Sequence, residues 1–312
     1  MNRFITSNKH FFSFIQVRTL ASKNIQTLQL KSKPFDFVSI KELLPNYKVF
    51  HENCNCYLNT LSEREKLVDP FAQLKTPNND TKDPQSEIPI FKRHLLLLDF
   101  TSPKKKSHLD WLSKIEKDSN FPFNAVQIIK NKNMDLMKKN KSLPIMVNVV
   151  EMIDSKLETC DPSHYHVLSL PEWKVVSFND ASIKLAAEIL NSEYPIGSIT
   201  HPGIKISDYD SKDLMLICGH KQRDSRCSVI ATEILTKRDL FKDISKYNIG
   251  IISHIGGHKV AGNVAVYLRP REKQQTTSVW LRHITPAAVD LVMGQLQKGI
   301  IVREFFRGLS IF

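Results

Sequence analysis

Short apolar runs of strand length, separated by segments with helical spacing, constrain most strongly what this chain can fold into. The patterns predict buried strands over 93–100 and 214–219, and further strands over 124–130, 144–152, 173–178, 249–254, 263–268 and 278–283. They predict helices over 110–118, 181–192, 228–240 and 285–297. Strands that alternate with helices indicate an α/β fold.

The chain length indicates two domains, because 312 residues exceed the ~100–150 residues of one typical domain. Residues 166–312 have the order of strands and helices expected of a thioredoxin-like domain. Residues 23–165 are predicted to form a smaller α/β domain with a loop-rich start, which could be a second copy of a similar unit. This start includes residues 76–89, which are predicted to be an exposed linker or long loop because they are rich in Asn, Asp, Pro and Ser.

The first 22 residues predict a mitochondrial presequence. They carry Arg3, Lys9 and Arg18 among Phe, Ile, Ser and Thr, and the first acidic residue of the chain is Asp36. Acid-poor, Arg- and Ser-bearing segments are typical of transit peptides. The alternative is a basic tail without a targeting role. Import predicts a mitochondrial protein, with the matrix favoured over the intermembrane space.

The net charge of +12 does not by itself indicate a nucleic-acid partner. The positive runs at 104–106 and 130–141 lack interleaved aromatic residues on which bases could stack, so we interpret them as solvated surface. The longest apolar run, 95–98 with its flanks, is far shorter than the ~20 residues that a membrane-spanning helix needs. We therefore expect neither a nucleic-acid partner nor a membrane span.

The five cysteines are too few for a disulfide scaffold in a chain of this length, so their positions matter more than their number. Cys54 and Cys56 stand in HENCNCYLN and are interpreted as two unpaired thiols, with a redox pair or part of a metal site with His51 as the alternatives. Cys160 is isolated and is expected to be structural. The remaining two, Cys218 and Cys227, enclose the most unusual stretch of the sequence.

That stretch, CGHKQRDSRC, places Cys218 at the end of a predicted strand and Cys227 at the start of a predicted helix. A helix N-terminus favours the thiolate form of a cysteine, and Arg223 and Arg226 add positive charge. Arg223 can also form an ion pair with Asp224 that shapes the loop. A thiolate is the form that binds iron or attacks a disulfide.

A second candidate segment, HIGGH, carries His254 and His258 around two glycines. Each glycine disfavours a helix by ~1 kcal/mol relative to alanine, so a tight loop between strands is expected. Glycine also allows a close backbone approach, which lets two imidazoles point at one metal centre.

Two cysteines and two histidines can serve structural zinc or a [2Fe–2S] cluster. Eight residues separate Cys218 from Cys227, which is wider than the two to four of a common zinc finger. Rieske clusters use two Cys and two His but place one of each in every loop. His220 imitates a half-site of that kind, yet nothing after Cys227 completes it, so we assign His220 to the surroundings of the site or to the surface.

The two motifs, together with W280LRHITP and KGIIVREFFRG, resemble the sucrase/ferredoxin-like family. The resemblance is strongest over 214–308 and weaker over the segment RHLLLLDFTSPKKKSHLDWLSKIE. It implies a thioredoxin-like C-terminal domain and a [2Fe–2S] cluster whose ligands are Cys218, Cys227, His254 and His258. Lys221 and Gln222 stand where many relatives have a small residue.

The resulting expectation is a mitochondrial, ferredoxin-like electron carrier or redox sensor that works with a redox partner protein, and catalysis in the strict sense is not required. The alternatives are a thiol–disulfide oxidoreductase that uses Cys218 and Cys227, and a zinc-stabilised binding module. No phosphate loop or dinucleotide motif is present, so no nucleotide cofactor is expected.

Overall fold

The computed structural model describes residues 35–43, 86–100, 108–139, 144–153, 161–198, 201–209, 212–256, 261–270 and 275–312. The predicted presequence and four of the residues singled out above, Cys54, Cys56, Cys160 and His258, lie outside these ranges.

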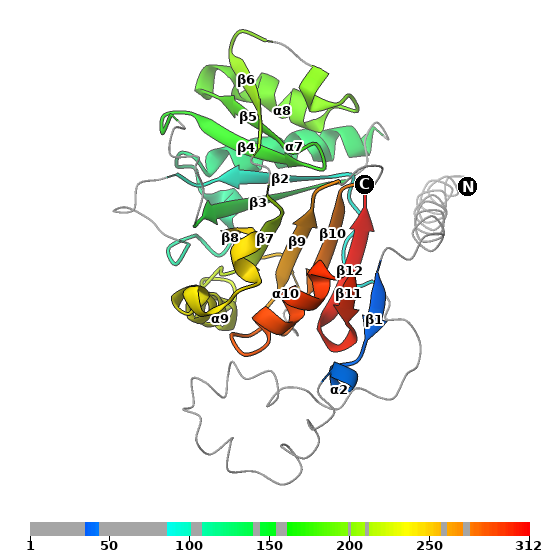
Figure 1. Cartoon of the computed structure of the whole chain (residues 1–312). Helices are drawn as coiled ribbons and strands as arrows, with labels where there is room; N and C mark the ends of the chain where they lie inside the picture. Colours follow the sequence, from blue (N-terminus) through cyan, green and yellow to red (C-terminus); the bar gives the residue numbers. More distant parts are fainter. Residues whose placement is uncertain are drawn as a thin grey trace, which may run out of the picture.

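One sheet of ten strands runs through the described part of the chain, in the order β12-β10-β9-β7-β8-β3-β2-β4-β5-β6 (Figure 1). Its strands are β2 (Arg93–Leu98), β3 (Ile145–Met152), β4 (Tyr165–Leu170), β5 (Lys174–Phe178), β6 (Ile204–Asp208), β7 (Leu214–Cys218), β8 (Asn248–Ile252), β9 (Val264–Leu268), β10 (Thr277–Leu281) and β12 (Phe306–Ile311). Separately, β1 (Asp36–Val38) pairs in parallel with β11 (Ile300–Val302). A short helix, α2 (Ile40–Leu43), follows β1.

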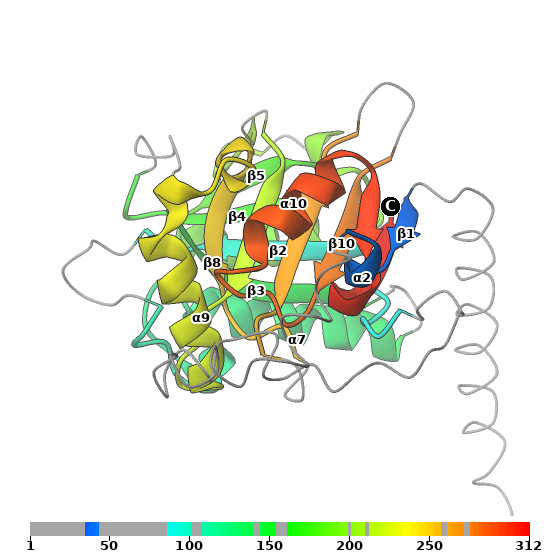
Figure 2. The same ribbon diagram turned by 60° about the horizontal axis from the view of Figure 1, so that its bottom comes forward.

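Among the described residues, four longer helices pack along this sheet, so the predicted α/β class is confirmed. In the first half, α7 (Asn124–Lys138) packs against β3 and against α8 (Ile183–Asn191). In the second half, α9 (Ser225–Thr236) packs against β7, and α10 (Val289–Gln297) lies in front of the sheet in Figure 2. Short 3-10 turns connect several elements, for example Ile115–Lys117 and Arg303–Phe305.

The two halves of the sheet repeat one strand order. In the first half β2 pairs in parallel with β3 and antiparallel with β4, which pairs with β5. In the second half β7 pairs in parallel with β8 and antiparallel with β9, which pairs with β10. The halves join where β3 and β8 pair antiparallel. The thioredoxin-like assignment and the division at 165/166 stay predictions; β4, which begins at Tyr165, pairs with β2.

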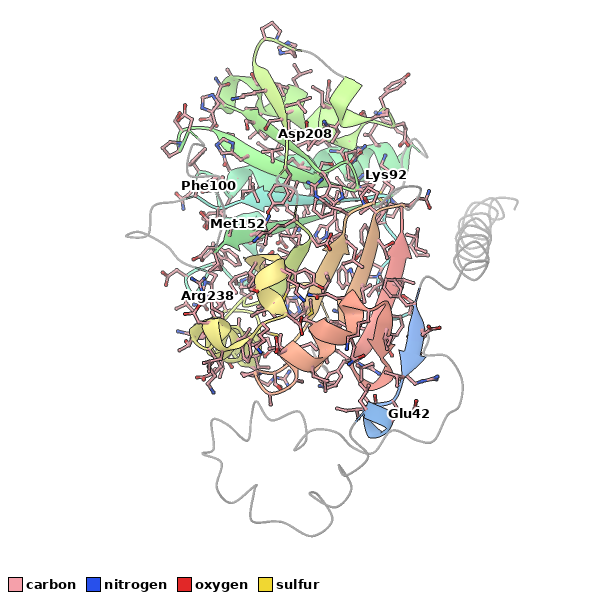
Figure 3. All side chains as sticks on the ribbon, in the orientation of Figure 1. Glu42, Lys92, Phe100, Met152, Asp208 and Arg238 are labelled. Atoms are coloured by element: carbon pink, nitrogen blue, oxygen red, sulfur yellow. The ribbon has the colours of Figure 1, made fainter. Side chains whose placement is uncertain are left out.

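The central strands are buried on both faces, which explains their continuous apolar sequence. All six residues of β2 and all five of β7 are buried. The labelled Lys92 and Phe100 mark the two ends of β2 in Figure 3, and Met152, the last residue of β3, lies on the Phe100 side. The carboxyl ends of these two parallel strands therefore share one edge of the sheet.

The segment 124–130 was predicted to be a strand and is instead the start of α7. Its apolar residues recur at helical spacing: Ala125, Val126 and Ile129 are buried, and Asn133 continues the same face. The window NAVQIIK was too short for this period to show against the β propensity of its branched residues. The predicted helix over 110–118 is reduced to the 3-10 turn at Ile115–Lys117. Of the strands in the sheet, β4, β6 and β12 were not predicted.

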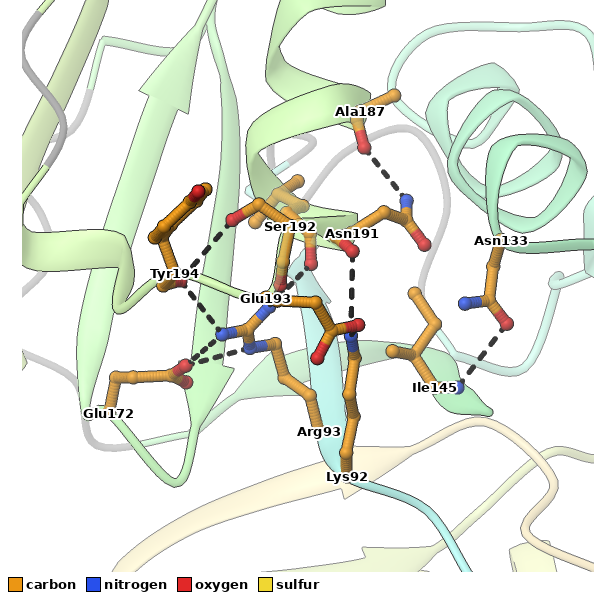
Figure 4. A network of polar contacts seen from close by, with 11 residues as sticks. Lys92, Arg93, Asn133, Ile145, Glu172, Ala187, Asn191, Ser192, Glu193 and Tyr194 are labelled. Carbon is orange, nitrogen blue, oxygen red and sulfur yellow. Dashed lines mark hydrogen bonds and ion pairs between the residues drawn. The ribbon is translucent and has the colours of Figure 1, made fainter. Parts of the chain in front are cut away.

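Arg93, the first residue of β2, ties the first half together (Figure 4). Its guanidinium donates to the carbonyl of Leu190 at 2.9 Å and of Ser192 at 3.0 Å, at the C-terminal end of α8. It also forms an ion pair with Glu172, which lies between β4 and β5. Because a helix C-terminus leaves carbonyls unsatisfied, the buried cation both caps α8 and anchors it to the sheet.

Candidate metal centre

The two cysteines of CGHKQRDSRC lie where the sequence predicted them, at a strand end and a helix start. Cys218 is the last residue of β7, and its N–H donates to the carbonyl of Asn263 on the neighbouring chain segment at 2.9 Å. Cys227 lies in the first turn of α9. Both are free thiols and both are completely buried.

Asp224 fixes the start of α9 and so the position of Cys227. Its side chain caps the helix by accepting from the N–H of Arg226 at 3.1 Å, as expected of an Asp at this position. The guanidinium of Arg226 binds the same carboxylate at 2.9 Å, so the ion pair forms with Arg226 and the interpretation of Arg223 as the partner was wrong. Burial tends to raise the pKa of Asp224, but the bonds from Arg226 outweigh it and the pKa is lowered.

The thiols of Cys218 and Cys227 are hydrogen-bonded to each other. This bond, with burial, raises the pKa of Cys218 well above its ordinary value, and the same bond lowers the pKa of Cys227. Backbone N–H groups also favour the ionised sulfurs: those of His220 and Ile255 act on Cys218, and that of Gly262 acts on Cys227. The hydrogen-bonded pair therefore favours a single negative charge, which lies on Cys227, while the thiol of Cys218 keeps its proton and donates it to that sulfur.

His254 follows β8 and brings its Nδ1 to 4.0 Å from the sulfur of Cys218. Its carbonyl accepts from the side-chain amide of Asn148 at 3.3 Å. The structure thus brings together three of the four predicted ligands, and His258 falls in the undescribed segment 257–260. Within the ranges that the structure describes, no three His, Cys, Asp or Glu side chains are grouped around the position of one metal ion.

His220 is buried and hydrogen-bonded to the backbone of His254, so of its two expected places it takes the one in the surroundings of the site and not the one on the surface. Its Nε2 donates to the carbonyl of Leu112 at 2.9 Å, and its Nδ1 accepts from the N–H of His254 at 3.2 Å. These two partners require the neutral ring, and burial lowers the pKa of His220 accordingly. The ring also packs edge-on against Trp111. Residues of the first half therefore cover the cysteine loop of the second.

Arg307 on β12 is a buried cation beside the site. It was not singled out from the sequence. One nitrogen, Nη1, donates to Oδ1 of Asn263 at 3.0 Å, and Nη2 donates to the carbonyl of Ile255 at 3.2 Å. Asn263 in turn donates to the carbonyl of Gly256 at 3.3 Å. The only signal was its place in KGIIVREFFRG, because no pattern in a single sequence shows that an arginine is buried.

The donor atoms of Cys218, Cys227 and His254 are of the kinds that bind a [2Fe–2S] cluster. Thiolates and neutral imidazoles are the ligands of His-ligated [2Fe–2S] centres, and hydrogen bonds to the sulfurs set the potentials of such centres. The four ligands of a two-iron cluster are divided between two ions, so they are not expected to converge on one point. Cys218 and Cys227 would share one iron, with His254 and His258 on the other.

The fold and the site define an α/β protein with a buried cysteine pair and a histidine loop next to it. In line with this, the model of the sucrase/ferredoxin-like family matches residues 85–308, and the chain belongs to that family.

The chain is also similar to several yeast proteins called altered inheritance of mitochondria protein 32. It is 30% identical to that of Eremothecium gossypii, over 73% of this chain and 82% of the relative. It is 26% identical to that of Kluyveromyces lactis, over 96% of this chain and 97% of the relative. The Saccharomyces cerevisiae protein is also 26% identical, over 91% and 97% respectively. No solved structure matches the chain significantly.

None of the helices in the described part of the chain combines the length and apolar composition that crossing a membrane requires.

Proposed function

We propose that the chain is a mitochondrial redox protein that carries a [2Fe–2S] cluster on Cys218, Cys227, His254 and His258. The observation that carries this proposal is the completely buried, hydrogen-bonded pair of thiols with an imidazole nitrogen 4.0 Å from one sulfur. When bound, the cluster would supply one-electron chemistry with a raised potential, because neutral imidazoles replace two thiolates.

The surrounding residues favour the negative charge that reduction adds and fix the position of His254. The N–H groups of His220, Ile255 and Gly262 favour negative charge on the sulfurs, which is the direction in which reduction changes the charge. His220 holds the backbone of His254 from one side and Asn148 holds it from the other. Fixed hydrogen-bond partners of this kind position the ligand and limit its rearrangement between two charge states.

The mitochondrial assignment rests on two observations. The similar yeast proteins are named for the inheritance of mitochondria, and the first 22 residues have the composition of a presequence. We propose the matrix as the compartment, and a soluble redox protein as the partner that delivers or receives the electron.

Burial favours electron transfer over the alternative thiol–disulfide exchange. The two hydrogen-bonded thiols are close enough to suggest a redox dithiol. Exchange, however, requires a sulfur of the partner to reach one of these sulfurs, and both cysteines have no exposed surface. An electron does not need such contact, so the site suits a cluster better than a catalytic dithiol.

The test is anaerobic purification of the full chain, with iron, sulfide and zinc quantified together and EPR recorded after dithionite reduction. We expect equal amounts of iron and sulfide and the low average g of a His-ligated cluster. Cys227→Ser and His254→Ala should each abolish the signal, whereas His201→Ala, an exposed histidine outside the site, should keep it.

Zinc in place of iron and sulfide would support the binding module and contradict the proposal. A metal-free protein in which Cys218 and Cys227 are reversibly oxidised, and which fails cluster reconstitution, would support the thiol oxidoreductase. An unchanged spectrum in His254→Ala would exclude His254 as a ligand.

A further inference from the structure

Arg307 is a charged side chain in a place where a charge is costly. The residue is 5% exposed, and its guanidinium lies over the ring of Trp280, with the central carbon 5.3 Å from the ring centre. Both of its hydrogen bonds described above end on neutral oxygen atoms, the amide of Asn263 and the carbonyl of Ile255. A buried cation is tolerated when negative charge compensates it.

Asn263 links Arg307 to the cysteine pair, because its side chain accepts from the guanidinium at 3.0 Å and its carbonyl accepts from the N–H of Cys218 at 2.9 Å. The sulfurs of Cys218 and Cys227 are therefore a buried source of negative charge near the guanidinium when they are ionised as metal ligands. Burial lowers the pKa of Arg307, and the charges of Cys218, Glu87 and Cys227 oppose that effect. Glu87 also faces Arg282, at 3.5 Å, and its carboxylate is largely exposed, so water screens it. Cys218 and Cys227 are buried, and their electrostatic interaction with the guanidinium is screened much less.

We infer that Arg307 is the residue that tunes the electron affinity of the site, through its permanent buried charge beside Cys218 and Cys227. This inference rests on the proposed function and deepens it. Two ferric ions, two sulfides, two thiolates and two neutral imidazoles sum to zero charge, and one added electron makes the centre negative. A fixed cation therefore stabilises the reduced centre more than the oxidised one, and the reduction potential rises.

The same guanidinium holds the histidine loop at two points. It binds the carbonyl of Ile255 directly, and it binds Asn263, which holds the carbonyl of Gly256. Both carbonyls lie on the stretch that leads from His254 into the undescribed segment 257–260. Replacing Arg307 can thus change the reduction potential in two ways, by removing the charge or by releasing the histidine loop. Different variants are needed to separate the two effects.

Three variants of the full chain separate the effect of the charge of Arg307 from the effect of its hydrogen bonds to the histidine loop. Arg307→Gln removes the charge and keeps a hydrogen-bond donor, whereas Arg307→Lys keeps the charge and loses the planar fork. Arg303→Gln is the control, because Arg303 donates to the carbonyl of Phe37 on β1 and makes none of the site contacts described here. Each protein is purified anaerobically, its iron and sulfide are counted, and its potential is measured by EPR-monitored titration with dithionite.

We expect Arg307→Gln to lower the equilibrium constant for reduction at least tenfold, which for one electron is a shift of about 59 mV to more negative potential. Arg307→Lys should shift the reduction potential by less than half of that amount, and Arg303→Gln should leave the potential unchanged. Loss of the cluster in Arg307→Gln but not in Arg307→Lys would also support a requirement for the charge.

An unchanged potential in an Arg307→Gln protein that still binds the cluster overturns the inference. An equal shift of the potential in both Arg307 variants, or loss of the cluster in both, overturns it as well. In those cases the hydrogen bonds to the histidine loop, and not the charge, would explain the role of Arg307. If the wild-type chain takes up no iron and sulfide, the proposed function fails and the inference fails with it.

Discussion

Gly262, beside Cys227, is a position where a single added carbon should destabilise the fold strongly. Its φ is +74°, in the left-handed region that costs an L-residue about 1–2 kcal/mol. A Cβ there would lie 2.4 Å from the carbonyl oxygen of Ile284 and 2.9 Å from its nitrogen. Both are backbone atoms that cannot rotate away, so the segment around Gly262 and the segment around Ile284 must move apart.

Two backbone hydrogen bonds join these segments, from His283 to Ala261 at 3.1 Å and from Ile284 to Gly262 at 3.0 Å. Each is worth about 1 kcal/mol, so their loss adds to the backbone strain. We expect Gly262→Ala to lower the free energy of unfolding by about 3–4 kcal/mol.

Gly299, just after α10, is the matched control because it has the same backbone conformation without the crowding. Its φ is +77°, and a Cβ there would meet nothing within 4 Å. Gly299→Ala should therefore cost only the conformational part, about 1 kcal/mol. Urea unfolding followed by tryptophan fluorescence compares the two variants. Equal losses would refute the reasoning, because they would show that the approach of Ile284 carries no cost.

Three further predictions concern the surroundings of the site. Burial lowers the pKa of His94 from 6.5 to about 4, so between these values the unfolded chain binds a proton that the fold does not. Stability should fall by about 1.4 kcal/mol per pH unit from this group as the pH drops from 6.5 to 4, and His94→Gln should remove that part of the slope in urea unfolding. Asp224→Ala should cost about 1 kcal/mol by removing the cap of α9, measured by thermal unfolding, whereas Asp224→Asn should keep most of it. Trp111→Phe removes the bond from the indole N–H to the buried carboxylate of Asp99 at 3.0 Å and should cost about 2 kcal/mol in the same assay.

The elements that the sequence predicted well are those whose pattern follows from local physics. The run at 95–98 is uninterrupted because β2 is buried on both faces, and the start of α9 follows from an Asp that can cap it. Cys218 and Cys227 were placed correctly for the same reason, since a strand end and a capped helix start fix them.

What the sequence could not show depends on pairings between distant segments. The helical face of α7 was hidden in a window of seven residues. The sequence left His220 between the surroundings of the site and the surface, because its partners, Leu112 and the N–H of His254, come from different parts of the chain. Arg307 lies 80 residues beyond Cys227, and only the pairing of β12 with β10 brings it back toward the site.

These long-range contacts also explain why the site needs both halves of the sheet. The cysteines and His254 belong to the second half, but the ring that steadies His254 is held by the carbonyl of Leu112, in the first half. Glycine at 219 serves the same junction, because a Cβ there would lie 2.4 Å from Ile251 and 3.5 Å from the ring of His108. His108 is itself fixed by Glu151 on β3, at 2.9 Å. The family match over 85–308 spans both halves, in line with these contacts of the first half with His220 and Gly219 of the second.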